Sequence, residues 1–296
     1  MFKSGFVSIV GRPNVGKSTL LNKILGEKVA IVSSKPQTTR TKITGVHTEE
    51  DAQFVFIDTP GIHTAQNKLG EFMNKTVQQA TSDVEVVLYM ADITQGNGER
   101  EKQTIEGLHM EGAAVFLVIN KIDLVQKGKI LPFIAMCNQL YDFKEIIPIS
   151  AQKGEGVVKL LSVIKKYLPE GPKYFPDDTL TDQPERVIVA EMIREKLFRL
   201  MNDEIPFGTA VEIEKMVYDE ARNLTSISGV IHCEKASHKG MIIGKQGSML
   251  KRVGSDARRD IERLLGTKVF LELWVKVEEN WRNKNSDLRN FGYFNE

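Results

Sequence analysis

Residues 11–18 read Gly11-Arg12-Pro13-Asn14-Val15-Gly16-Lys17-Ser18, which fits the pattern GxxxxGKS. An apolar run at residues 6–10 precedes this pattern, and a helical stretch opens at Lys17. Glycine lets backbone amides turn towards a phosphate, and a helix N-terminus adds positive potential there. The pattern therefore predicts a polyphosphate site in which Lys17 reaches the β- and γ-phosphates and Ser18 binds Mg²⁺. The nucleotide-lining residues that it predicts are Gly11, Arg12, Pro13, Asn14, Val15, Gly16, Lys17, Ser18 and Thr19.

Apolar runs of the same kind recur along the first 168 residues. They are short, continuous and rich in β-branched residues, and they fall at residues 6–10, 54–57, 84–90, 114–119 and 146–149. Strands that are buried on both faces have this composition. Amphipathic segments of helical length separate the runs. The alternation predicts an α/β fold with a doubly wound, mostly parallel sheet, in which ligands bind where the strands end.

Residues 58–61, Asp58-Thr59-Pro60-Gly61, end the second of these runs. A carboxylate at that strand end lies beside the phosphate loop, where it can hold Mg²⁺ directly or through water. The amide of Gly61 is then placed to sense a γ-phosphate. Taken alone, DTPG is also a common turn after a strand.

Residues 120–123, Asn120-Lys121-Ile122-Asp123, follow the run at 114–119 and indicate the base. Asp123 can accept hydrogen bonds from the N1–H and 2-amino groups of guanine, and adenine offers neither donor. Because an unpaired buried carboxylate is unfavourable, such a site rejects the wrong base. Lys121 can stack over the base, and Asn120 can tie this loop to the phosphate loop. After the last run, Ser150-Ala151 can offer a backbone amide to the guanine O6.

These motifs predict GTP and GDP with Mg²⁺ as ligands, and Asp123 argues against an ATP-dependent P-loop enzyme. Lys and Arg total 40 against 39 Asp and Glu in 296 residues, so the net charge of +1 indicates no general affinity for polyanions. Only two cysteines are present, without metal-ligand spacing, which argues against disulfides and zinc. No signal peptide or membrane-spanning stretch is recognisable, and we expect a cytoplasmic protein.

Four prolines between residues 169 and 185 indicate a linker. We therefore predict a first domain at residues 1–168, a linker at 169–185, a smaller α+β domain at 186–280 and a charged tail at 281–296. The second domain reads αββααβ. Its first helix follows the linker, its strands are expected at 209–218 and 228–234, two helices around 249–253 and 256–265, and a last strand at 268–277.

Gly244-Lys245-Gln246-Gly247 is the informative element of the second domain. GxxG alone says little because glycine is common. We expect this one between the strand at 228–234 and an amphipathic helix, where such a loop can clamp about four nucleotides of RNA backbone. Basic residues outnumber acidic ones around it, although a solvated helix face explains part of that charge. The RNA-binding residues predicted are Ile243, Gly244, Lys245, Gln246, Gly247 and Lys251.

The motifs GRPNVGKS, DTPG, NKID and SA stand in the order found in translation-factor-like small GTPases, which residues 1–168 resemble. In that class a switch-loop threonine completes the Mg²⁺ shell, and residues 36–40 (PQTTR) are similar to that loop. The resemblance implies Thr39 as this ligand, with Thr38 as the alternative. The catalytic residues implied are Lys17, Thr39 and Gly61, and the Mg²⁺ ligands implied are Ser18, Thr39 and Asp58.

One position departs from GTPases of the Ras type. Ile62 stands where they carry a glutamine that orients the attacking water. An aliphatic side chain cannot orient water. We therefore expect slow intrinsic hydrolysis, with the water placed by backbone groups, Mg²⁺-bound groups or a partner. His63 is an adjacent titratable candidate.

Over nearly its whole length the sequence resembles the Era GTPases of bacteria, including residues 271–277 (LELWVKV) and 288–293 (LRNFGY). This resemblance implies a P-loop GTPase domain followed by a type II KH domain. It also implies binding near the 3′ end of 16S ribosomal RNA and a role in maturation of the small ribosomal subunit. It further implies a monomer with peripheral association at the inner face of the cell membrane. The alternative is a GTPase whose KH-like domain makes protein or membrane contacts, which the GKQG loop and its basic surroundings argue against.

Overall fold

The computed structural model describes residues 1–95, 98–108, 110 and 112–293, and the chain divides into two compact units. The first unit comprises Met1–Ala30, Thr39–Ala65 and Gly70–Asp182. The second comprises Ile31–Thr38, Gln66–Leu69 and Gln183–Glu296. Within the described residues, no helix has the length and apolar character needed to span a membrane.

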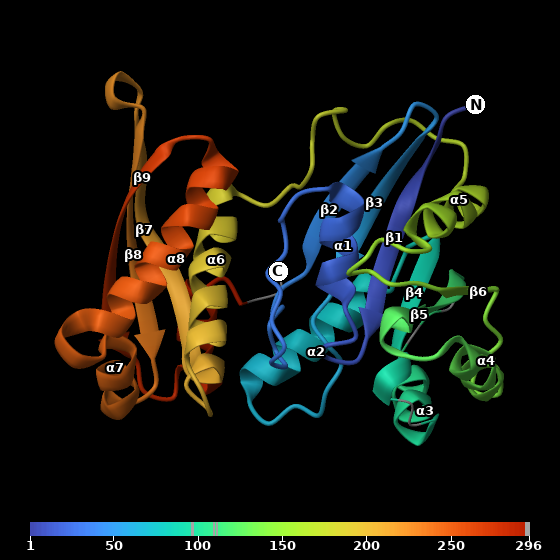
Figure 1. Cartoon of the computed structure of the whole chain (residues 1–296), viewed down its shortest axis with the longest axis horizontal. Helices are drawn as coiled ribbons and strands as arrows, with labels where there is room; N and C mark the ends of the chain where they lie inside the picture. The colour runs from blue at the N-terminus through green and yellow to red at the C-terminus, as the bar shows by residue number, and fades with distance from the viewer. Residues whose placement is uncertain (96–97, 109, 111, 294–296) are drawn as a thin grey trace. The chain divides into compact units, whose positions relative to one another are not determined.

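A six-stranded sheet forms the centre of the first unit, in the order β2-β3-β1-β4-β5-β6 (Figure 1). Neighbouring strands run parallel except β2, which is antiparallel to β3. This confirms the predicted doubly wound, mostly parallel sheet. The prediction missed β2, because Gly45 and His47 interrupt its apolar run at the sheet edge. The bounds are β1 Lys3–Gly11, β2 Ile43–Thr48, β3 Ala52–Asp58, β4 Val86–Asp92, β5 Ala114–Asn120 and β6 Glu145–Pro148.

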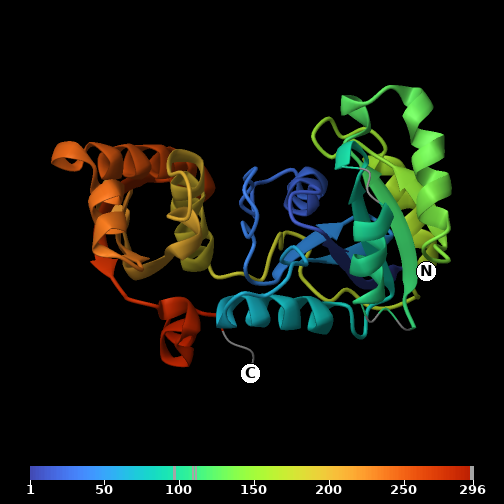
Figure 2. The ribbon, with the colours of Figure 1, turned by 90° about the horizontal axis from the view of Figure 1, so that it is seen from below.

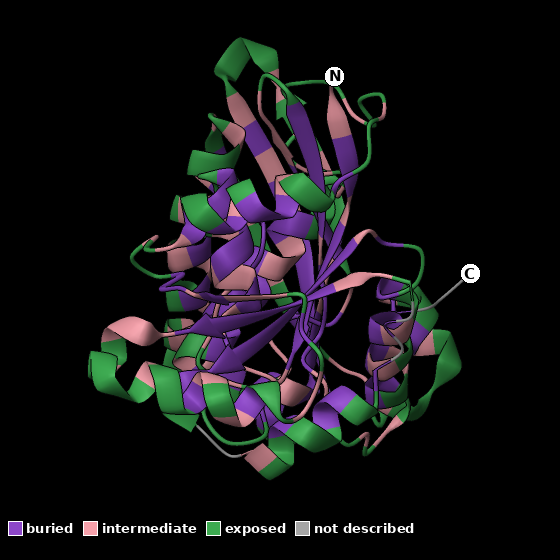
Figure 3. Ribbon diagram, turned by 90° about the vertical axis from the view of Figure 1, so that its right-hand side faces the viewer, coloured by how far each residue is buried: buried purple, intermediate pink, exposed green. Residues whose placement is uncertain are grey.

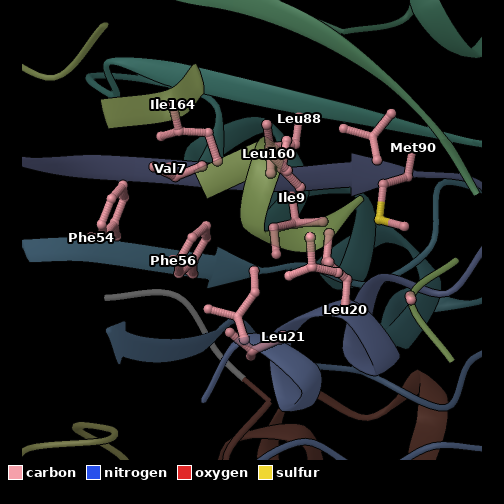
Figure 4. Close-up of a cluster of buried hydrophobic side chains, with 14 of the residues drawn as sticks. Val7, Ile9, Leu20, Leu21, Phe54, Phe56, Leu88, Met90, Leu160 and Ile164 are labelled. Atoms are coloured by element: carbon pink, nitrogen blue, oxygen red, sulfur yellow. The ribbon is translucent and has the colours of Figure 1, made fainter. Parts of the chain in front are cut away.

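Helices cover both faces of this sheet. Side chains of α1 (Lys17–Leu25) and α5 (Val157–Tyr167) pack on one face, as Figure 4 shows for Leu20, Leu21, Leu160 and Ile164. Side chains of α2 (Lys68–Ala80), α3 (Gly98–Glu106) and α4 (Ile130–Asn138) pack on the other. Strands β1 to β5 between them are mostly buried, whereas the edge strand β6 is mostly half-buried (Figure 3). Burial of each large aliphatic side chain contributes about 1.5–3 kcal/mol, which explains the continuous apolar runs of the strands.

The proline-rich segment after α5 is bonded to the first unit through residue 182, and we call residues 169–182 the strap. Gln53 of β3 is fully buried, and its side chain bonds the backbone of the strap at Tyr174 and Phe175, with distances of 2.7–3.0 Å. The amide of Val46, in β2, donates to the carbonyl of Leu180 at 2.9 Å. Most of the predicted linker therefore lies along the edge of the first sheet.

The second unit has the predicted order αββααβ. Its sheet has the order β7-β8-β9, with β7 antiparallel and β9 parallel to β8. Helices α6 and α8 lie together over one face of this sheet (Figure 2). The bounds are α6 Glu185–Leu200, β7 Thr209–Asp219, β8 Leu224–Cys233, α7 Ala236–Ile243, α8 Ser248–Leu265 and β9 Lys268–Val277.

Two helix assignments in this unit were wrong. The helices expected at 249–253 and 256–265 are one helix, α8, which continues through Gly254 because Val253, Ala257 and Ile261 are all fully buried on its inner face. The other helix of the pair is α7, which comes before the GKQG loop. The loop therefore joins α7 to α8 and does not directly follow the strand. Packing of an apolar stripe outweighs the helix-breaking tendency of one glycine.

The sequence after β9 packs against the second unit as far as residue 293. Short helices form at η7 (Trp281–Asn283) and α9 (Asn285–Asn290). Trp281 is fully buried, and its indole N–H donates to the carbonyl of Gly208 at 3.0 Å. The ring of Phe291 lies 4.4 Å from that of His232 in β8. Residues 294–296 of the predicted tail lie outside the described residues.

Residues 31–38 also belong to the second unit, where they contact α6. The amide of Val32 donates to the carboxylate of Glu195 at 3.1 Å, and the Arg194 guanidinium donates to the carbonyl of Thr38. Glu195 and Arg194 are fully buried. Since buried charges need partners, these contacts hold the segment that directly precedes Thr39.

Candidate functional site

The phosphate loop lies between β1 and α1, at the carboxyl edge of the first sheet. Gly11 and Gly16 have φ angles of 146° and 106°, which side chains rarely adopt. A Cβ on Gly16 would lie 2.2 Å from the side-chain nitrogen of Asn120, so this position accepts glycine alone. Asn14 is also left-handed, Val15 is buried, and Thr19 follows in the first turn of α1. Side chains in place of these glycines would obstruct the loop, so its backbone conformation depends on glycine.

Lys17 lies inside this loop and is 6% exposed. Its Nζ donates to the carbonyls of Gly11 and Arg12 at 3.1 and 3.0 Å. Burial lowers the pKa of Lys17 to about 8, and nearby Asp58 partly opposes that change. A desolvated cation at the centre of a phosphate loop suits a polyphosphate anion.

Three oxygen-bearing side chains gather beside the loop. The Ser18 hydroxyl donates to Asp58 Oδ2 at 2.6 Å and lies 2.9 Å from the Thr39 hydroxyl. Burial raises the pKa of Asp58 to about 6, against the lowering effect of Lys17. Within the described residues, the buried Oδ1 of Asp58 has no hydrogen-bond partner. Hard oxygen donors with one unsatisfied carboxylate oxygen fit Mg²⁺.

Thr38 and Thr39 differ in their contacts. The Thr38 hydroxyl donates to the carbonyl of Lys35 at 2.7 Å, whereas the Thr39 hydroxyl is the one that faces Ser18. Thr39 is buried. This geometry favours Thr39 over Thr38 as the Mg²⁺ ligand.

Gly61 lies against the phosphate loop. A Cβ at this position would lie 2.6 Å from Pro13 Cα, so glycine is needed for the close approach. The amide of Ile62 donates to the carbonyl of Gly11 at 3.2 Å. His63 turns back, with Nδ1 3.0 Å from the carbonyl of Gly61. These contacts join residues 61–63 to the loop, and the role of His63 towards water stays a prediction.

Asn120 joins the base loop to the phosphate loop. Its side-chain nitrogen donates to the carbonyl of Val15 at 2.7 Å, and its side-chain oxygen accepts from the amide of Ala151 at 2.9 Å. Ser150 is fully buried beside it. Since the Ala151 amide already donates to Asn120, a guanine O6 would have to share that donor.

The Lys121 ammonium group has a carboxylate partner, Asp92, that was not predicted from the sequence. Its Nζ donates to the carbonyl of Asn14 at 2.8 Å and to Asp92 Oδ2 at 2.6 Å. Asp92 ends β4 and is buried. An acidic residue at the carboxyl end of a parallel strand was the available signal for it.

The Asp123 carboxylate stays open to a ligand. Its side chain is 10% exposed, and Lys153 Nζ lies 3.9 Å from Oδ2. That separation is too long for a hydrogen bond, so both oxygens can accept from a base. Asn120, Lys121 and Asp123 thus lie around one edge of the sheet with the phosphate loop.

The GKQG loop of the second unit opens outward between α7 and α8. Gly244, Gln246 and Gly247 have φ angles of 73°, 50° and 77°. A Cβ on Gly244 would lie 2.7 Å from Met249 Cβ, whereas Gly247 faces open space. Lys245 and Gln246 are exposed, and Ile243 is half-buried below them. The loop presents backbone and one cation to solvent.

A groove of about 520 Å³ adjoins this loop along α8 and β9. Lys251 and Arg258 line one side and are exposed. Most of the other lining residues are apolar, including Leu250, Leu273 and Phe270. A positively edged, apolar groove beside a glycine loop suits nucleobases whose backbone follows the loop. The sequence alone did not indicate Phe270 for this groove, because β9 is brought beside α8 by folding.

Comparison with known families matches both units. Residues 6–121 match the model of the 50S ribosome-binding GTPases, and residues 204–282 match the KH domain. The chain is 55% identical over 294 residues to GTPase Era of Clostridioides difficile, covering 99% of each chain. It is 53% identical over 292 residues to GTPase Era of Geobacter metallireducens, covering 99% of this chain and 98% of the relative.

Two solved structures are similar to this chain over nearly its whole length. A single-residue variant of Aquifex aeolicus Era bound to GDP·AlF4⁻ has a TM-score of 0.95 and 41% identity, covering 99% of both chains. A structure of Era with MgGDPNP and nucleotides 1506–1542 of 16S ribosomal RNA has the same TM-score, identity and coverage. The two units are therefore a P-loop GTPase domain and a KH domain.

Proposed function

We propose that this chain, which belongs to the Era family of GTPases, binds 16S ribosomal RNA through its KH domain and assists maturation of the small ribosomal subunit. GTP binding and hydrolysis switch the chain between two states. Lys17, Ser18, Thr39, Asp58 and Gly61 hold the triphosphate and Mg²⁺, which would supply charge neutralisation at the phosphates. Asn120, Lys121 and Asp123 select guanine.

One observation carries the RNA part of this proposal. A glycine loop with left-handed backbone and an exposed cation, Lys245, leads directly into a groove with apolar walls and basic edges. A KH-like domain that made only protein contacts would not need a phosphate-binding loop beside its groove. A homologous Era with 41% identity has been solved with nucleotides 1506–1542 of 16S ribosomal RNA, which supports this RNA as the ligand.

Crosslinking in cells followed by sequencing of the bound RNA tests the proposal. We expect reads concentrated near the 3′ end of 16S ribosomal RNA, and fewer of them for a chain with Lys245→Asp and Gln246→Asp. Reads spread evenly over cellular RNA, or equal recovery from the variant, would reject this RNA as the ligand and favour the protein-contact or membrane-contact alternative.

We also propose a cytoplasmic location for the chain, because its proposed partner, the small ribosomal subunit, is a cytoplasmic particle. Peripheral association at the inner face of the membrane and a monomeric state remain predictions. Cell fractionation and sedimentation of the purified chain test them.

A further inference from the structure

Arg12 leaves the phosphate loop and pairs with a buried carboxylate on α3. Its Nη1 lies 3.1 Å from Glu101 Oε1, and the two side chains are 17% and 2% exposed. The second carboxylate oxygen of Glu101 accepts a hydrogen bond from the Tyr89 hydroxyl in β4. Three elements thus meet at one carboxylate.

Each carboxylate oxygen of Glu101 accepts a hydrogen bond from a different donor, Arg12 or Tyr89. Burial, reinforced by Glu101, raises the pKa of Tyr89, so the phenol keeps its proton and donates. Arginine is always charged, and its bond to a carboxylate is charge-assisted. Both oxygens of this buried group are therefore satisfied, which gives Arg12 a fixed position.

Lys17 and the segment around Gly61 both contact the backbone that Arg12 anchors. The carbonyl of Gly11 accepts from Lys17 Nζ and from the amide of Ile62, and the carbonyl of Arg12 also accepts from Lys17 Nζ. Pro13 follows directly and leaves no room for a Cβ on Gly61. Movement of this stretch would displace Lys17 and Gly61 together.

The geometry points to Glu101, supported by Tyr89, as a positioning residue for GTP hydrolysis that acts through Arg12. It fixes the start of the phosphate loop against α3, so that Lys17 and Gly61 hold the γ-phosphate in the reactive arrangement. This role rests on the proposed assignment of Lys17 and Gly61. Positioning errors of about 1 Å can lower a rate about 10²-fold, and a partial release of the loop should have a smaller effect.

The test uses the full chain and four variants: Glu101→Gln, Arg12→Met, their combination and Tyr89→Phe. Single-turnover GTP hydrolysis at saturating GTP gives the rate, and titration with mant-GDP gives the affinity. We expect about tenfold slower hydrolysis for Glu101→Gln. Its GDP affinity should stay within about threefold of the parent, since the α- and β-phosphate contacts remain. Tyr89→Phe should change the rate in the same direction by less.

A double-mutant cycle shows whether the effect passes through Arg12. The combined variant should be no slower than the slower single variant, because both substitutions remove the same contact. Additive effects would overturn the inference. So would equal losses of rate and GDP affinity, or an unchanged rate in both Glu101→Gln and Tyr89→Phe. If Glu101→Gln does not fold, Tyr89→Phe decides by the same criteria.

Two controls separate this inference from the proposed site. Glu106→Gln removes an exposed carboxylate on the same helix, which pairs with Lys102 at 3.9 Å, and should hydrolyse GTP at the parent rate. Lys17→Ala should lose tight triphosphate binding. If it does so while the Glu101 and Tyr89 variants behave as the parent, only the positioning role fails. If Lys17→Ala still binds GTP tightly, the site assignment itself fails.

Discussion

The two candidate sites of this molecule are built in opposite ways. The nucleotide site collects side chains from the ends of separate strands, and Lys17, Asp58 and Asn120 are each at most 6% exposed. The GKQG loop is one continuous stretch whose Lys245 and Gln246 are exposed. A buried site depends on contacts between distant segments, whereas an exposed loop depends on local backbone. Substitutions should therefore change the chemistry of the first site sharply and the affinity of the second gradually.

The largest expected effect is a change of base preference. Asp123→Asn should weaken GTP binding by about 10⁴-fold, because the amide no longer accepts from both guanine donors. Xanthosine triphosphate should bind the variant better than GTP does, since the amide can donate to its 2-oxo group. Competition against mant-GTP measures both. Lys153→Ala, which removes the cation 3.9 Å from Asp123, serves as control and should bind GTP like the parent. Unchanged GTP affinity in Asp123→Asn would remove Asp123 from the site.

Lys17→Ala should separate the two units functionally. We expect triphosphate affinity to fall by about 10²-fold or more, because the charged contacts to the β- and γ-phosphates are lost. RNA affinity of the full chain without nucleotide should be unchanged, as the GKQG loop is in the other unit. Fluorescence titrations with nucleotide and with labelled RNA give both numbers. A matching loss of RNA affinity would contradict the separation.

The exposed loop should give a graded electrostatic effect. A loop that clamps about four phosphates predicts a slope of about −2.8 in log affinity against log salt for single-stranded RNA. Lys245→Asp with Gln246→Asp should remove most of that slope by repelling the backbone, and hydrolysis without RNA should be unchanged. Arg222→Asp, a substitution in the exposed β7–β8 turn of the same unit, is the control. A slope that survives the double substitution would place the phosphate contacts elsewhere.

The smallest expected effect links the two sites. Residues 31–38 contact α6 and directly precede Thr39, so a γ-phosphate that orders Thr39 should also change the second unit. The RNA affinity in the presence of a non-hydrolysable GTP analogue should be at least about fivefold higher than in the presence of GDP. RNA must then tighten binding of the analogue, relative to GDP, by the same factor. Equal RNA affinities in both nucleotide states would leave the two sites uncoupled.

The sequence predicted the parts of this molecule that depend on local pattern. Five strands of the first sheet were recognised because burial on both faces demands apolar runs. β2 was missed because an edge strand tolerates Gly45 and His47. The αββααβ order was right, yet the helices expected at 249–253 and 256–265 are one helix, because Val253 and Ala257 pack on the same inner face on either side of Gly254.

The residues of the nucleotide site also divide into those that could be predicted from the sequence and those that could not. The phosphate loop and the NKID segment were recognisable because their chemistry fixes residue type at short spacing. Asp92 and Glu101 were not recognised, because each contacts a residue of the phosphate or base loop that lies 29 or 89 residues away in the sequence. No spacing rule covers contacts that only the fold creates.

The strap has a consequence for the chain during synthesis. β2 is an edge strand, and an open edge can pair with the same strand of another molecule. The amide of Val46 is covered only when Leu180 has been made, and the side-chain oxygen of buried Gln53 obtains its donors from residues 174 and 175. A nascent chain therefore carries an open edge until the strap leaves the ribosome. A fragment that stops at residue 168 would keep that edge permanently and should self-associate, whereas one that stops at residue 182 closes it.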